Sequence, residues 1–203
     1  MISKIKLCFR INYLLLFCFL SGCKTMNSED AYKSCVIERT QKKLIEGYGI
    51  EKDIFKLLED VEFSLIESKI IPNTNKESYL KLVKILFNDE ETSEKIKISI
   101  KTSLDGNLYN LVGITALDFY SNCPEKVFYN EVNSTKESVL RKRFTIYADL
   151  MADGYKNETK IYSLINESEK FSKTERLVIL HLILLNLSYE TKKPISFEMG
   201  FIF

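Results

Sequence analysis

The sequence predicts a mainly α-helical protein, organised as a bundle of about seven to eight helices in a single domain over residues 31–203. Apolar residues recur every three or four positions in several stretches, which is the period of a helix. Two Ser/Thr-x-x-Glu boxes, at Thr74 and Ser172, have the form of a helix N-terminus. The run Leu177–Leu187 is apolar on every face, as expected of the central helix of a bundle.

The first expected helix covers Ala31–Glu46. Ser28 is the predicted N-cap, followed by two acidic residues that suit the positive end of the helix dipole. Gly47 and Gly49 are expected to end this helix.

Two more helices should follow with short connections. The apolar stripe of Ile50–Ile70 predicts a helix that ends before Pro72. Thr74 and Glu77 then predict a capping box ahead of the next apolar stripe. Short connections favour antiparallel packing of neighbouring helices.

The middle of the domain is expected to be helical apart from one short strand. Leu108–Tyr120 and Ser138–Met151 carry helical patterns, Pro124 begins a separate element, and Asn157–Asn166 is a further helix. The alternating stretch Ile96–Ile100 is the expected strand, with a helix as the alternative.

The end of the chain suggests a partner for that strand. Ile195–Phe203 also alternates, so the sequence allows one small β pair between Ile96–Ile100 and this tail. The helix before it, predicted to open on a Ser172/Glu175 capping box, is too short in its apolar part to cross a bilayer. Its His181 is the only histidine of the chain and is expected to be a buried structural imidazole, with a functional imidazole as the alternative.

The N-terminus has the anatomy of a secretory signal. Lys4, Lys6 and Arg10 form a basic segment, and Ile11–Leu20 is an apolar core that is too short to serve as a membrane span. Residues 1–22 are therefore predicted to be a signal peptide.

The four residues Leu20-Ser21-Gly22-Cys23 resemble the lipobox of bacterial lipoprotein precursors. The resemblance implies that the Cys23 thiol receives a diacylglyceryl group, that cleavage follows Gly22, and that residues 23–30 are a lipidated tether. Two or three acyl chains such as palmitate anchor a protein stably to a membrane. The expected location is thus the cell envelope, and Lys24 mildly favours an outer membrane in a Gram-negative cell.

The remaining cysteines are Cys35 and Cys123, because Cys8 and Cys18 would leave with the signal peptide. In an oxidising compartment these two thiols form a candidate disulfide. The alternative is that each is a small apolar core residue.

Charge argues against a nucleic-acid partner. The chain has 29 basic and 28 acidic residues, and removal of the signal peptide leaves a small acidic excess where a nucleic-acid-binding protein would show a basic one. The expected partners are a membrane, contacted through Cys23, and a protein of unknown identity.

The residue inventory favours a non-catalytic binding or accessory lipoprotein. No catalytic triad, metal motif or phosphate loop is present, so no cofactor or metal is expected. An immunity lipoprotein that neutralises a toxin and an envelope enzyme that uses a carboxylate pair are the alternatives. The candidate carboxylates are Glu59 with Asp60 and the run 89–91, although such acidic residues are usually solvated surface charge. A candidate aromatic patch comprises Phe119, Tyr120, Phe128 and Tyr129, with packing in the core as the favoured explanation of the same residues.

Overall fold

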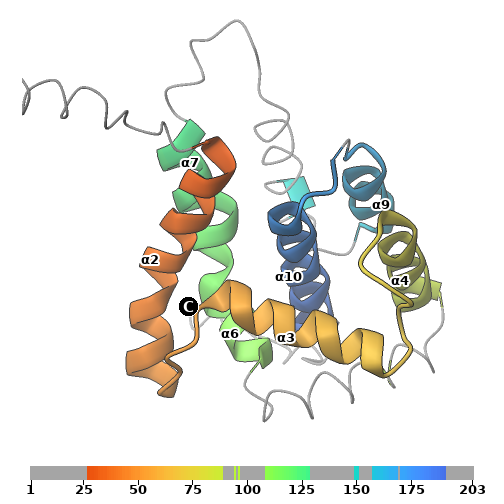
Figure 1. Cartoon of the computed structure of the whole chain (residues 1–203), viewed down its shortest axis with the longest axis horizontal. Coiled ribbons are helices and arrows are strands. Elements are labelled where there is room, and N and C mark those ends of the chain that lie inside the picture. Colours follow the sequence, from red (N-terminus) through yellow and green to blue (C-terminus); the bar gives the residue numbers. More distant parts are fainter. Residues whose placement is uncertain are drawn as a thin grey trace, which may run out of the picture.

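The computed structural model describes residues 27–88, 94, 96, 108–128, 149–150, 157–168 and 170–190. These residues are mainly helical, and no strand occurs among them (Figure 1). The predicted signal peptide (residues 1–22), Cys23 and the tail Ile195–Phe203 lie outside this part, as does most of Ser138–Met151. Of the expected strand Ile96–Ile100, only Ile96 is described, and it is buried and helical.

Helix α2 (Ser28–Tyr48) begins three residues before the expected range Ala31–Glu46 and extends two residues beyond it. Its N-cap is Asn27, whose side chain accepts a hydrogen bond from the backbone of Asp30 at 2.8 Å, so the prediction of Ser28 as N-cap was wrong. Gly49 ends the helix in the left-handed region, at φ 66°, as expected for a glycine C-cap.

Helices α3 (Ile54–Glu67) and α4 (Lys76–Asn88) also start at caps that the sequence analysis missed. Asp53 caps α3, because its carboxylate accepts from the backbone of Lys56 at 3.0 Å. Asn75 caps α4 by accepting from the backbone of Ser78 at 2.9 Å, one residue after the predicted Thr74. Helix α3 starts later than its apolar stripe suggested, because the cap side chain, rather than the first apolar residue, decides where a helix begins.

The segment after α6 (Leu108–Leu117) widens into a π-helix, η1 (Asp118–Asn122), before α7 (Cys123–Phe128). The backbone N–H of Cys123 bonds to the carbonyl of Asp118, five residues earlier. Pro124 explains the wide turn, because a proline has no N–H and its ring would clash with the carbonyl four residues before it. The carbonyl of Phe119 instead accepts from the Tyr32 hydroxyl of α2 at 2.9 Å.

The last two described helices are α9 (Glu158–Asn166) and α10 (Lys173–Glu190). The Ser172/Glu175 capping box is confirmed, since each side chain accepts from the other residue's backbone N–H at 3.2 Å. Every residue from 177 to 188 is buried, so α10 is the core helix that the sequence predicted.

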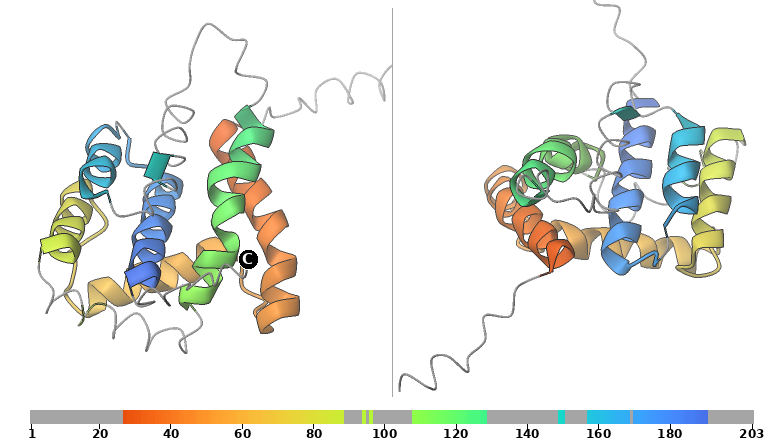
Figure 2. Two further views of the ribbon diagram at one scale, coloured as in Figure 1. Left: turned by 180° about the vertical axis from the view of Figure 1, so that it is seen from behind. Right: turned by 90° about the horizontal axis from the view of Figure 1, so that it is seen from above.

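The helices are arranged around α10. Helix α3 crosses the molecule and packs against α10 and α2, while α6 packs along another side of α10 (Figure 1). Seen from above, α2 and α6 lie on one side of α10, and the packed pair α4 and α9 lies on the other (Figure 2). The molecule therefore has two flanks joined by a central helix and by α3.

Candidate functional site

The predicted lipidation site, Cys23, lies outside the described residues. In the part of the chain that the structure describes, no helix combines the length and apolar character needed to cross a bilayer.

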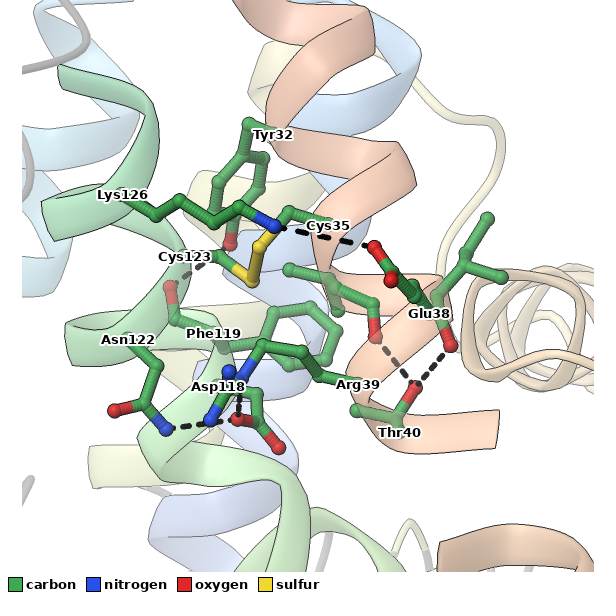
Figure 3. Close-up of a disulfide and its surroundings, with 12 residues drawn as sticks. Tyr32, Cys35, Glu38, Arg39, Thr40, Asp118, Phe119, Asn122, Cys123 and Lys126 are labelled. Atoms are coloured by element: carbon green, nitrogen blue, oxygen red, sulfur yellow. Dashed lines mark hydrogen bonds and ion pairs between the residues drawn. A yellow bond between two sulfur atoms is a disulfide. The ribbon is translucent and has the colours of Figure 1, made fainter. Parts of the chain in front are cut away.

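The two candidate cysteines are joined in the structure. Cys35 of α2 and Cys123 at the start of α7 form a disulfide with Cα atoms 5.7 Å apart (Figure 3). Both residues are buried, so the disulfide is part of the core. It fixes α2 against the turn that follows η1.

A buried carboxylate lies one turn before this disulfide. The side chain of Asp118 has no exposed surface, yet it contacts Arg39 Nε at 2.7 Å and Lys43 Nζ at 2.6 Å (Figure 3 shows the Arg39 pair). Asn122 donates a third hydrogen bond at 2.8 Å. Burial alone would raise the pKa of Asp118, but the hydrogen bonds from Lys43, Arg39 and Asn122 outweigh it and lower the pKa. We call these four residues the Asp118 cluster.

A second carboxylate is buried on the opposite flank. Glu62 of α3 accepts from Arg176 Nε at 2.5 Å and Nη2 at 3.1 Å, and from the Tyr79 hydroxyl at 2.5 Å. Burial and the Glu62 charge raise the pKa of Tyr79 well above its usual value. Burial opposes the charge of Arg176, but the hydrogen bond to Glu62 outweighs it and raises the pKa of that guanidinium. This Glu62 cluster of three residues ties α3, α4 and α10 together.

His181 lies between the two flanks. It is fully buried on α10, and its ring stacks on Phe119 of η1 with the ring centroids 4.0 Å apart. Both ring nitrogens have partners, since Thr115 lies 3.0 Å from Nε2 and the Tyr120 hydroxyl 2.7 Å from Nδ1.

The proton on His181 can be assigned from these partners. Thr115 donates its single hydroxyl proton to the carbonyl of Leu111 at 2.7 Å, so it must accept from Nε2–H. Tyr120 then donates to Nδ1, and the imidazole is neutral. Burial lowers its pKa to about 3, against a smaller opposite effect of a backbone hydrogen bond with Val112. The only histidine is thus a structural residue, as the sequence analysis favoured.

The other residues singled out in the sequence do not form a cleft. Glu59 pairs with Lys173 at 2.8 Å and Asp60 with Lys52 at 2.6 Å, all partly exposed. Phe119 and Tyr120 are buried, which confirms core packing for these two residues and excludes them from an exposed aromatic patch. The Phe128 side chain, Tyr129 and residues 89–91 lie outside the described part.

One surface depression among the described residues was not anticipated from the sequence. It is an open groove of about 600 Å³ between α4 and α9. Its lining residues are mostly polar: Lys84, Asn88, Glu158, Thr159, Tyr162, Ser163 and Asn166. The signal in the sequence was Tyr162, an aromatic residue on the polar face of α9, which is 41% exposed.

The described lining of the groove contains one carboxylate, that of Glu158. This carboxylate accepts a hydrogen bond from the Asn88 side chain at 3.0 Å. Among the described residues, no group of three or more His, Cys, Asp or Glu side chains could hold a metal ion. The arrangement suits the binding of a polar ligand better than acid and base catalysis by two carboxylates.

No family model matches the chain, and neither the search of curated proteins nor that of solved structures finds a match. The fold and the groove define a mainly helical protein with a polar surface site.

Proposed function

We propose that this protein is exported, lipidated at Cys23 and held at a membrane of the cell envelope, where it acts as a non-catalytic binding or accessory protein. Residues 1–22 serve as the signal peptide and 23–30 as the tether, and an outer membrane is the favoured destination in a Gram-negative cell. A protein is the favoured partner class, and the α4–α9 groove is a candidate contact site for a ligand or for part of that partner.

The observation that carries the proposal is the lipobox. Leu20-Ser21-Gly22-Cys23 directly follows a basic and an apolar segment, in the order that a lipoprotein signal requires. The Cys35–Cys123 disulfide supports export independently, because structural disulfides persist in oxidising compartments and are rare in the cytosol.

The binding role is supported by how the described acidic residues are used. Glu62 and Asp118 are occupied by buried ion pairs that hold helices together. Glu158 is the single carboxylate that lines the α4–α9 groove. A catalytic pair of carboxylates in a cleft would require a second acid near it.

Lipid labelling of Cys23→Ala tests the proposal, with Cys18→Ala as the matched control. Cells that express the full chain are grown with radiolabelled palmitate and then fractionated. The wild-type protein and Cys18→Ala should carry label and run at the processed size in the membrane fraction. Cys23→Ala should be unlabelled, because it lacks the thiol that is acylated. A processed Cys23→Ala that stays in the membrane fraction would contradict lipidation at this residue.

The finer architecture belongs to the same proposal. We expect about seven to eight helices in the domain. We also expect a small β pair between Ile96–Ile100 and Ile195–Phe203, in which the strand begins after Ile96, because Ile96 is helical. Backbone chemical shifts and cross-strand nuclear Overhauser effects measure both features.

A further inference from the structure

The geometry points to the α4–α9 groove as a binding site for a short, uncharged oligosaccharide, an inference that rests on the binding role proposed above. The groove is framed by two helices that are distant in sequence but packed side by side (Figure 1). Its volume of about 600 Å³ falls in the range of sites that take small organic ligands.

The lining differs from that of a site for an apolar ligand. Such sites are mostly hydrophobic with a few polar groups, whereas here one aromatic ring is surrounded by amides, hydroxyls, an ammonium and a carboxylate. Sugars have the matching chemistry, because each ring carries several hydroxyls that both donate and accept, together with an apolar C–H face.

The polar groups are positioned to face a ligand. The Asn88 Nδ2 group donates to Glu158 at 3.0 Å and to the carbonyl of Lys84 at 3.1 Å, which fixes the amide and leaves its oxygen as an acceptor. Lys84 has no ion pair with another described residue and can donate to a hydroxyl. Glu158 can accept from a second hydroxyl through a charge-assisted hydrogen bond.

Tyr162 supplies the apolar surface. Tyr162 lines the groove and is 41% exposed, so part of its aromatic ring is available for contact with the C–H face of a sugar. One ammonium and one carboxylate nearly cancel, and the lining thus offers little attraction to a polyanion or a polycation. An uncharged saccharide fits both the ring and the charge balance.

The test is a titration of the full-length protein in detergent, monitored by the side-chain amide resonances of Asn88 and Asn166. The probes are N,N′,N″-triacetylchitotriose and maltotriose. We expect at least one of them to shift these resonances saturably, with a Kd on the order of 1 mM, as is reasonable for an open site.

Three variants localise the effect. Tyr162→Ala should weaken binding at least tenfold, while Tyr162→Phe, which keeps the ring, should stay within about threefold of the wild type. Phe63→Ala is the matched control, because Phe63 is an aromatic residue of α3 that is 60% exposed outside the groove, and its removal should leave binding unchanged. An unchanged thermal melt of each variant shows that it is folded.

Two results would overturn the inference. One is the absence of a saturable shift with either trisaccharide up to about 10 mM. The other is a saturable shift of the same resonances by trialanine alone, which would make the groove a peptide site. Either result could occur in a protein that is still labelled at Cys23, so failure of the saccharide inference is distinct from failure of the proposed lipoprotein function.

Discussion

The Glu62 cluster and the Asp118 cluster use similar chemistry but differ in how far their cations are removed from water. Each has a buried carboxylate, yet Arg176 is only 15% exposed, whereas Arg39 and Lys43 are 45% and 43% exposed. A cation that can return to water loses little when its partner is removed, but a buried cation loses its main compensation. Burial of the cation, rather than the number of ion pairs, should therefore decide which flank depends more on its carboxylate.

Glu62→Ala should give the largest loss. It leaves a buried guanidinium and the Tyr79 hydroxyl without their acceptor, and we expect the free energy of unfolding to fall by about 3–5 kcal/mol. Urea unfolding followed by circular dichroism measures the change. The matched variant is Asp118→Ala, and the comparison between the flanks fails if Asp118→Ala proves the more destabilising of the two.

Removal of the disulfide should have the next largest effect and tests the flank that contains the Asp118 cluster. The cysteines are 88 residues apart, so the bond restricts a long loop in the unfolded chain. The double variant Cys35→Ala/Cys123→Ala should lose about 2–4 kcal/mol. A reductant should destabilise the wild-type protein by a similar amount and leave the double variant unaffected; an equal effect on both would show that the reductant acts elsewhere.

Acid should weaken the junction between the flanks through His181. The pKa is about 3 in the folded protein and about 6.5 in the unfolded chain, so below pH 6.5 the unfolded state binds more protons. The stability that the neutral imidazole contributes is complete above pH 6.5. It falls by about 1.4 kcal/mol per pH unit between pH 6.5 and pH 3, so about 2 kcal/mol has been lost at pH 5. In His181→Gln, the free energy of unfolding should fall less steeply with decreasing pH between pH 6.5 and pH 3, as urea unfolding at several pH values would measure. An identical pH dependence in the wild-type protein and the variant would contradict the buried neutral ring.

The smallest effect is expected for Asp118→Asn, which keeps the shape of the side chain and removes its charge. We expect a loss of about 1–2 kcal/mol, because the two cations are partly solvated. The difference from the wild-type protein should shrink in 1 M salt, where the screening length is about 3 Å. Asp60→Asn, in an exposed pair with Lys52, is the control and should change stability by less than about 1 kcal/mol.

Local features of the fold were predictable because they depend on neighbours in sequence. Each of three confirmed features depends on residues that are close together in the sequence: the Ser172/Glu175 box, the Gly49 C-cap and the apolar run of α10. Caps failed where two suitable residues stood close together, as with Asn27 before Ser28, since the backbone angles choose between them.

The clusters and the groove could not be read from the sequence because their members are far apart along the chain. Glu62 meets Arg176 across 114 positions, and Asn88 meets Glu158 across 70. The hydrogen bond from the Tyr32 hydroxyl to the Phe119 carbonyl of η1 likewise joins residues 87 positions apart. Only Tyr162, exposed on a polar face, hinted at the groove.

The position of the disulfide in the chain has a consequence for the order of folding. Both cysteines precede α9 and α10, so in a chain exported N-terminus first they reach the oxidising compartment before the helix that fills the core. The covalent link can therefore close around a chain that still lacks its central helix. Until α10 arrives, α3 and α6 lack the central helix against which both pack, and this short-lived species is the point in biogenesis where aggregation is most to be expected.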